Sequence, residues 1–288
     1  MPAPTIPRSP IPKFTAREIK TAELCSRALW YGIDFETGKP QMSDSEFIDV
    51  LAGPMYSHSP NKSTFKPSVF KTDVHKLIRA GKLTALYRSI RLLDFNKGVR
   101  SIHNQIFKIF FNARRAPRTT NKLNTGINAI ELLSKSLVRN LNNNQLVLAS
   151  RIVFYLCPNL TISNMNNRVA KHFGLQTRPH HHYIEFQHLF KNGLVANQTN
   201  LNKCKLPMRH GKMRKKQWRI VNNTDWYQRR VLDIAVLLSL NLAIPATQLK
   251  NQVNEFEKNL LDEIQKKKLL AAKKKARSKG AAAVRAIK

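Results

Sequence analysis

The chain has 288 residues, and the 42% that are hydrophobic suffice for one large domain or two modest ones with a real core. Fifty Lys and Arg stand against 17 Asp and Glu, which gives a formal net charge of +33. Such a charge is far beyond what solubility requires, and it is costly in self-repulsion unless a polyanion neutralises it. The composition therefore excludes a disordered polymer and makes nucleic acid the expected partner.

Cysteine usage and the apolar runs limit the class of protein further. Cys25, Cys157 and Cys204 lie far apart and form no CxxC pair, which fits a reducing compartment better than a disulfide framework. The longest apolar run, "VLLSLNLAI" at residues 236–244, is far shorter than the roughly 20 residues of a membrane span. The basic start has no apolar h-region, and its prolines disfavour the amphipathic helix of a mitochondrial presequence. We expect no membrane association.

In the first part of the chain, the helical periodicity of apolar residues begins only at Asp73. We predict a Pro-rich flexible arm over residues 1–20 and a poorly patterned region over 20–70, with turns at "TGKP" and "HSPNK". From Asp73 apolar residues recur at spacings of three and four, which predicts helices over 73–93 and 99–110.

The rest of the chain is more regular. After the basic segment "FNARRAPRTTNK" at residues 111–122, helices are predicted at 127–141 and 144–156. The second is apolar on most sides, which indicates a central core helix, and Cys157-Pro158 ends it. Later helices are expected to begin at Ser163, after Asp225 and near Thr247. The last of these runs to the end of the chain with apolar Leu249, Val253, Phe256, Leu260 and Ile264.

These elements predict a mainly α fold, a multi-helix globular core with a Pro-rich N-terminal arm and a long basic C-terminal helix. The expected division is a flexible arm at 1–20, a helical nucleic-acid-binding core at 21–245, and a C-terminal helix with a basic tail at 246–288.

Positive charge gathers in three places. The first cluster lies between Asp94 and Glu131, a stretch without acidic residues, the second lies in "KCKLPMRHGKMRKKQWR" at 203–219, and the third is the C-terminal tail. Phosphate contacts by such residues release counterions, so binding should be strong, sequence-independent and salt-sensitive. The predicted contact residues are Lys97, Arg100, Lys108, Arg114, Arg115, Arg118, Lys122, Arg168, Lys212, Arg214, Lys215, Lys216 and Arg219.

RNA is favoured over DNA as the partner, single-stranded RNA above all. The charge falls in predicted loops and turns rather than on one recognition helix, which suits wrapping a single strand. Asparagines in "NNN" at 142–144 and "NMNNR" at 164–168 add neutral donors for phosphate and sugar oxygens.

A helix-turn-helix DNA-binding motif is an open alternative. "NRVAKHFGLQTRPHHHYIEF" at 167–186 places Ala170 four residues before Gly174, with apolar Val169 and Leu175, which is the small-residue and turn-glycine pattern of that motif. His180 and Tyr183 depart from it, because aliphatic residues usually pack there.

The enzymatic and metal patterns are incomplete. "YGIDFETG" resembles the first motif of DEDD-type 3′ to 5′ exonucleases, with Asp34 and Glu36 as the two carboxylates, but Lys108 stands where the second motif needs an aspartate. His180, His181, His182, His188 and Cys204 lack paired metal spacing. Neither a P-loop nor a Rossmann glycine pattern is present. We therefore expect no enzyme, no metal and no cofactor.

Short motifs resemble the nucleoprotein of emaraviruses, the segmented negative-strand RNA viruses of plants. That family has an "N…SFNK"-type, an "NRLA"-type and a "GYEF"-type motif in this order. Here "NTGINA" (Asn124, Asn128) or "DFNK" (Asn96, Lys97) stands for the first, "NRVA" (Asn167, Arg168, Ala170) for the second, and "YIEF" (Tyr183, Glu185, Phe186) for the third. The glycine of the third motif is missing.

The resemblance implies a protein that encapsidates genomic RNA in a basic cleft, oligomerises by exchanging terminal arms, works with a viral polymerase, and is found in the virion and the host cytoplasm. "RRAPRTTNK" would then be a phosphate-gripping loop at the mouth of the cleft. The main alternative is a component of a large ribonucleoprotein such as a mitochondrial ribosome, whose loops and basic tail contact ribosomal RNA.

Overall fold

A computed structural model describes residues 10–49, 121–141, 146–176, 180–211, 213, 215–240, 244 and 246–286 of the chain. Over these residues the fold is mainly helical, as predicted. They contain an isolated β-bridge between Ile33 and Pro40, but no strand. The helices predicted at 73–93 and 99–110 lie outside the described residues, as does nearly all of the basic segment at 111–122.

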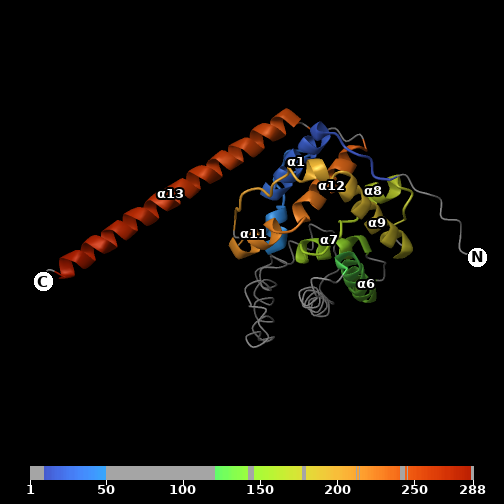
Figure 1. Cartoon of the computed structure of the whole chain (residues 1–288), viewed down its shortest axis with the longest axis horizontal. Coiled ribbons are helices and arrows are strands. Elements are labelled where there is room, and N and C mark those ends of the chain that lie inside the picture. Colours follow the sequence, from blue (N-terminus) through green and yellow to red (C-terminus); the bar gives the residue numbers. More distant parts are fainter. Residues whose placement is uncertain are drawn as a thin grey trace, which may run out of the picture.

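The helices with labels, in chain order and numbered as in Figure 1, are α1 (Ala16–Tyr31), α6 (Lys122–Leu141), α7 (Leu146–Leu156), α8 (Asn167–His172), α9 (His180–Ala196), α10 (Gln198–Leu201), α11 (Lys215–Asn222), α12 (Trp226–Leu238) and α13 (Ala246–Ala286). Residues 44–49 are helical as well.

α1 begins inside the segment that the sequence assigned to a flexible arm. Thr15 and Glu18 form a capping box, in which each side chain accepts a hydrogen bond from the backbone N–H of the other. Just before it, Ile11 and Phe14 are each only 4% exposed, and the Phe14 N–H donates to Asn197 Oδ1 at 2.7 Å. The prediction of an arm through residue 20 therefore needs correction, because the chain joins the core from Ile11 onward.

An aromatic cluster joins α1, α7 and α12 at the centre of the core. The Trp226 ring lies 5.1 Å from the Phe154 ring and 6.0 Å from the Trp30 ring, measured between centroids. Trp226 Nε1 donates to the Phe154 carbonyl at 3.0 Å, so the buried indole N–H is satisfied. α7 is buried along nearly its whole length and ends before Pro158, which confirms the predicted central helix.

α8 begins later than predicted. Its N-cap is Asn166, whose side chain accepts from the Arg168 N–H at 2.8 Å. Ser163 does not cap a helix, because its backbone N–H and carbonyl both pair with the Gln187 side-chain amide, at 2.8 and 2.9 Å. This pairing satisfies both backbone groups of Ser163 without a helix.

α13 begins beside α1 and then runs away from the core, and its C-terminal end lies far from the other helices (Figure 1). Leu249 and Val253 are fully buried against the core, as the predicted apolar stripe requires. Further along, Leu269 and Leu270 are 59% and 65% exposed. The helix is therefore held by its first turns only.

In the described part of the chain, no helix combines the length and the apolar character that crossing a membrane requires.

Candidate nucleic-acid interface

The predicted contact residues that the structure describes are exposed but dispersed. Lys122 opens α6, Arg168 lies in the first turn of α8, and Lys215 and Arg219 lie on α11. α8 and α11 lie at opposite ends of the core (Figure 1), so these side chains do not form a single patch. Lys216 is also part of α11. Outside the described residues lie Lys97, Arg100, Lys108, Arg114, Arg115, Arg118, Lys212 and Arg214.

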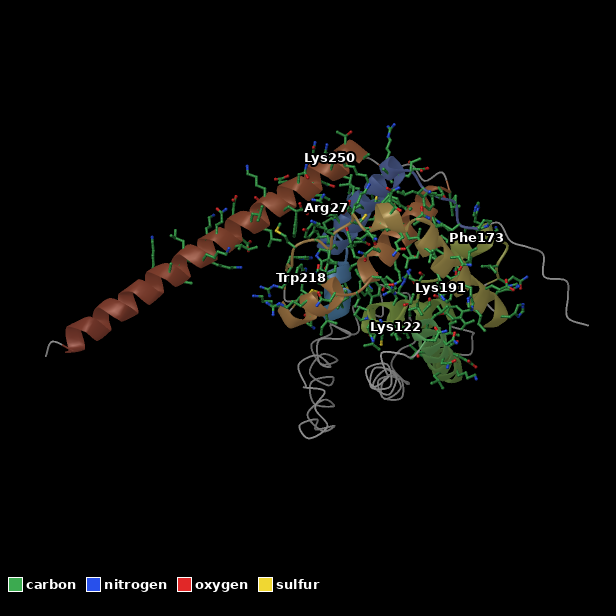
Figure 2. The ribbon with its side chains drawn as sticks, in the orientation of Figure 1. Arg27, Lys122, Phe173, Lys191, Trp218 and Lys250 are labelled. Atoms are coloured by element: carbon green, nitrogen blue, oxygen red, sulfur yellow. The ribbon has the colours of Figure 1, made fainter. Side chains whose placement is uncertain are left out.

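Other basic side chains are also spread over the molecule. Figure 2 labels Lys250 near the start of α13, Lys191 on α9 and Lys122 at the start of α6. All three are exposed. The described surface is thus positive on several sides.

The second basic cluster is held firmly against the core. Two tryptophans fix its backbone: Trp30 Nε1 donates to the Met208 carbonyl at 3.0 Å and Trp218 Nε1 donates to the Pro207 carbonyl at 2.9 Å. His210 Nε2 lies 2.6 Å from the Trp30 carbonyl, and burial lowers the pKa of this imidazole. The segment at 203–219 was predicted as a loop, and its described residues up to 213 form no helix after the turn at 202–203. From Lys215 onward the prediction was wrong, because these residues form α11.

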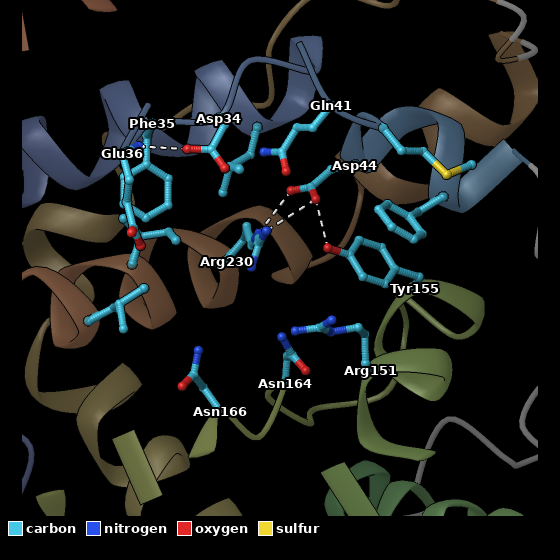
Figure 3. Close-up of a pocket in the computed structure, with 15 residues that line it drawn as sticks. Asp34, Phe35, Glu36, Gln41, Asp44, Arg151, Tyr155, Asn164, Asn166 and Arg230 are labelled. Carbon is cyan, nitrogen blue, oxygen red and sulfur yellow. Dashed lines mark hydrogen bonds and ion pairs between the residues drawn. The ribbon is translucent and has the colours of Figure 1, made fainter. Parts of the chain in front are cut away.

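A pocket of about 260 Å³ opens between the turn that follows α1, α7, the chain before α8, and α12 (Figure 3). We call it the Arg151 pocket. Its polar lining consists of Asp34, Glu36, Gln41, Asp44, Arg151, Tyr155, Asn164, Asn166 and Arg230.

A buried ion pair forms one wall of the Arg151 pocket. Arg230 donates to both carboxylate oxygens of Asp44, from Nε at 2.8 Å and from Nη2 at 3.1 Å, and the Tyr155 hydroxyl donates to the same carboxylate at 2.6 Å (Figure 3). Burial alone would lower the pKa of Arg230, but Asp44 and Tyr155 raise it on balance. The wall is therefore a satisfied, charge-neutral network and does not attract an anion by itself.

The rest of the polar lining includes Arg151, which lies one helical turn before Tyr155 on α7, and Asn164 and Asn166 from the chain before α8 (Figure 3). Asn166 Oδ1 caps α8, whereas Asn164 Oδ1 is buried without a hydrogen-bond partner. No described carboxylate forms an ion pair with Arg151. A guanidinium beside side-chain amides is suited to phosphate and sugar oxygens.

Part of this constellation was visible in the sequence. The asparagines of "NMNNR" were predicted as neutral donors, and the structure places two of them in the pocket. Arg151 was missed because it lies within the apolar pattern of the predicted core helix. The only signal was a single arginine that interrupts "LVLASRIVFYL".

Asp34 and Glu36 also line the pocket, and their contacts explain the exonuclease-like motif in structural terms. Asp34 Oδ1 accepts from the Glu36 and Thr37 backbone N–H groups, both at 2.9 Å, which is an Asx turn. Glu36 Oε1 lies 3.7 Å from Arg168 Nη1. Within the described ranges, no three His, Cys, Asp or Glu side chains gather as metal ligands would.

The cysteines are structural. Cys25, Cys157 and Cys204 are all buried and free, so no disulfide forms among them, as expected. Burial raises the pKa of each thiol to about 12, which keeps the sulfur protonated and poorly reactive at neutral pH.

Two local features of the helix-turn-helix pattern are present around α8. Val169 and Leu175 are buried, and Gly174 has a positive φ of 65°, which glycine adopts without strain. Tyr183, which departs from the motif, is fully buried in the core. α9 packs against α6 and α12, and Lys191 is its single Lys or Arg. Its composition does not favour a phosphate-binding recognition helix.

The residues that resemble emaravirus motifs fall into two groups. Asn124 and Asn128 on α6 and Asn167 on α8 are exposed, whereas Tyr183 and Phe186 are fully buried. The first two motifs therefore present polar groups to solvent, and the third belongs to the core. The alternative first motif, "DFNK", lies outside the described residues.

No protein-family model matches this chain, and neither curated proteins nor solved structures contain a match to it.

Proposed function

We propose that this protein is a non-enzymatic RNA-binding protein, a viral nucleoprotein that oligomerises and encapsidates genomic RNA. As such it would be found in the virion and the host cytoplasm and would present the coated RNA to a viral polymerase. The proposal rests on one observation: several of the protein's few carboxylates are paired with arginines of the fold.

Several carboxylates lie beside arginines of the fold and therefore do not offset the positive charge of the surface. Asp44 pairs with Arg230, which is 9% exposed, and Asp225 pairs with Arg229, which is 2% exposed. A third pair joins Glu257 on α13 to Arg27 on α1, and buried Asp233 lies near both core arginines.

Because of these internal pairs, much of the surface charge has no counterpart. Lys203 and Lys205 in the second cluster, and Lys266 and Lys268 on α13, are exposed, whereas Lys267 pairs with Glu263 at 3.3 Å. No acidic residue follows Glu263. An external polyanion is the simplest source of compensating charge.

The protein would contact the RNA strand in two ways. Arg151 with Asn164 and Asn166 offers a defined site for a backbone phosphate and its sugar. The basic segment at 111–122, which enters α6 at Lys122, and the basic end of α13 would add contacts that track the strand without reading its sequence.

One observation favours a second candidate. The basic end of α13 projects from the core without packing against it (Figure 1), as a helix inserted into folded ribosomal RNA would. The alternative is therefore a single-copy component of a large ribonucleoprotein, mitochondrial or cytoplasmic.

The test is the size and RNA content of the purified protein, by light scattering with absorbance at two wavelengths, before and after nuclease and high salt. RNA-filled rings or filaments that fall to small oligomers are expected for a nucleoprotein. A monomer that binds RNA one to one would favour the ribonucleoprotein component. A nucleic-acid-free monomer that ignores single-stranded RNA would overturn both.

The Arg151 pocket can be tested in the same assay. Arg151→Gln should weaken RNA binding and lower the slope of log affinity against log salt by about 0.7, as expected for one lost contact to a single strand. Lys135→Gln is the matched control, because Lys135 is exposed and already paired with Glu131 at 2.6 Å. Equal slopes for the two variants would remove Arg151 from the interface.

A further inference from the structure

A second, larger pocket of about 600 Å³ lies where four helix junctions meet. It is bounded by the start of α6, the connection from α7 to α8, the segment from the end of α9 through α10, and the turn between α11 and α12. Its volume falls within the roughly 300–1,000 Å³ of small-molecule sites. Most of its lining is neutral and polar, including Asn159, Thr161, Asn202, Asn222, Asn223 and Gln228. We call it the amide pocket.

A buried arginine braces the wall of the amide pocket. Arg229 Nη2 donates to the Pro158 carbonyl at 2.7 Å and Nη1 donates to the Ile162 carbonyl. These two bonds hold the connection that carries Asn159 and Thr161 at both of its ends. The wall is therefore fixed from inside the core rather than formed by mobile side chains, which is the preorganisation that a binding site needs.

The same arginine sets the charge of the pocket. The two charged residues in its lining are Lys122 and Asp225. Asp225 Oδ1 accepts from Arg229 Nε at 3.1 Å, so its charge is already compensated. Lys122 is exposed and leaves the pocket mouth with a net positive charge. A suitable ligand thus has an uncharged body and an anionic group at one end.

One acceptor in the lining of the pocket, the side-chain oxygen of Gln228, lacks a hydrogen-bond donor. This oxygen, Oε1, is buried and has no partner, although buried polar atoms are nearly always paired. A ligand N–H or O–H would satisfy it. The surrounding asparagines each carry a donor and an acceptor, so they can pair with either kind of group on a ring edge or a sugar.

The position of the pocket relates it to the basic segment at 111–122. Lys122 is both the last residue of that segment and the first of α6, and Asn121 precedes it as the cap, accepting from the Leu123 N–H at 3.1 Å. The described end of the segment, Asn121 and Lys122, thus places one lysine of the first basic cluster at the mouth of the amide pocket.

We propose that the amide pocket takes the base and ribose of one nucleotide of the bound RNA strand, with the adjoining phosphate at Lys122. A nucleotide has the required form, an uncharged ring and sugar rich in donors and acceptors with one anionic end. The mixed amide lining suits all four bases and the 2′-hydroxyl, so the pocket holds a base without selecting it. The inference rests on the proposed function, since it presumes that RNA binds.

The experiment compares a single-stranded RNA oligomer with an abasic ribose-phosphate strand of equal length, on the full-length protein. Both strands carry the same phosphates, so the ratio of their affinities isolates the contribution of the bases. Gln228→Leu removes the buried acceptor at similar volume. Gln252→Leu is the matched control, because Gln252 Oε1 is also buried without a partner but belongs to α13. Asn159→Leu tests the opposite wall.

The wild type should bind RNA at least tenfold more tightly than the abasic strand. Gln228→Leu should weaken RNA binding about five- to tenfold and abasic binding less than twofold, since it removes hydrogen bonds but no charge. Asn159→Leu should act in the same direction. Lys122→Gln should weaken both strands alike and lower the salt slope by about 0.7.

Failure of the inference is distinct from failure of the proposed function. RNA binding that does not change in Gln228→Leu and Asn159→Leu, or that changes equally in Gln252→Leu, would overturn the pocket assignment and leave RNA binding intact. If neither strand binds, the proposed function falls as well. If free adenosine monophosphate binds at micromolar concentration with the same dependence on Gln228 while the two strands bind equally, the pocket serves a free nucleotide and the strand assignment is overturned.

Discussion

Asp44 is the carboxylate at the centre of a buried hydrogen-bonded network. Its carboxylate holds Arg230 by two hydrogen bonds and accepts from Tyr155. Removing one partner of a buried pair leaves the other charge uncompensated, at a cost of about 3–5 kcal/mol. We expect Asp44→Ala to lower the free energy of unfolding in urea by this amount. Lys135→Ala, which breaks the exposed pair with Glu131, should change it by less than about 0.5 kcal/mol.

Asp233 makes stability depend on pH. Burial raises its pKa from 3.8 to about 7, although Arg230 and Arg229 act in the opposite direction. The folded state therefore binds the proton more tightly than the unfolded state, and stability should fall as pH rises from about 4 to about 7. The slope contributed by one such group is at most about 1.4 kcal/mol per pH unit.

Asp233→Asn isolates this contribution. The variant cannot titrate at that position, so its free energy of unfolding relative to the wild type should increase with pH across the same interval. The comparison also cancels His210, whose lowered pKa makes stability fall as pH drops below about 6.5. A difference between the two proteins that does not change from pH 4 to pH 7 would contradict the assignment.

Helix α6 packs so closely against the chain that follows α7 that only glycine fits at position 126. A Cβ at Gly126 would lie 2.2 Å from Ile162 Cγ2, and the Ile162 backbone is held by Arg229. In an open helix Gly→Ala stabilises by about 0.5–1 kcal/mol. Here the overlap should reverse the sign, and we expect Gly126→Ala to destabilise by about 1–3 kcal/mol.

The control for this prediction lies on the same helix. Asn128 is exposed, so Asn128→Ala should stabilise by a few tenths of a kcal/mol through helix propensity alone, about 0.5 kcal/mol at most. Both variants are compared by thermal and urea unfolding. A melting temperature that rises in Gly126→Ala would mean that α6 does not pack against Ile162 as described.

The helices that the sequence predicted well are those with large apolar side chains in a clear period. α7, α12 and the first turns of α13 were recognisable in this way. α1 was missed because much of its buried face is made of small side chains, Ala22, Cys25, Ser26 and Ala28, which carry a weak hydrophobic signal. Its capping box would have revealed it.

The site was less predictable than the fold. Charge clusters are visible in any sequence, and they pointed to exposed residues such as Lys122 and Arg168. Arg151 and Gln228 line pockets only because distant segments come together around them. Their chain neighbours are mostly core residues, so local pattern assigns them to packing. No periodicity argument separates a polar residue that faces a pocket from one that faces solvent.

The two ends of α13 differ in packing and in charge. Its first turns bury Leu249 and Val253 and bind the core through Glu257, which pairs with Arg27 and accepts from the Tyr31 hydroxyl at 2.9 Å. The part beyond Glu263 has lysine and arginine but no acidic residue. Fold stability and polyanion binding should therefore be separable by mutation.

The triple variant Lys266→Gln, Lys267→Gln, Lys268→Gln tests this separation. Glutamine keeps the helix propensity of lysine, and all three side chains are exposed. Lys267 loses only an exposed ion pair with Glu263, so the free energy of unfolding should change by less than about 0.5 kcal/mol, and the helical circular dichroism should not change. The slope of log affinity for single-stranded RNA against log salt should fall by up to about 2, the value for three lost phosphate contacts. An unchanged slope with intact helix would mean that this end of α13 does not contact RNA, and would leave the core pockets as the described part of the interface.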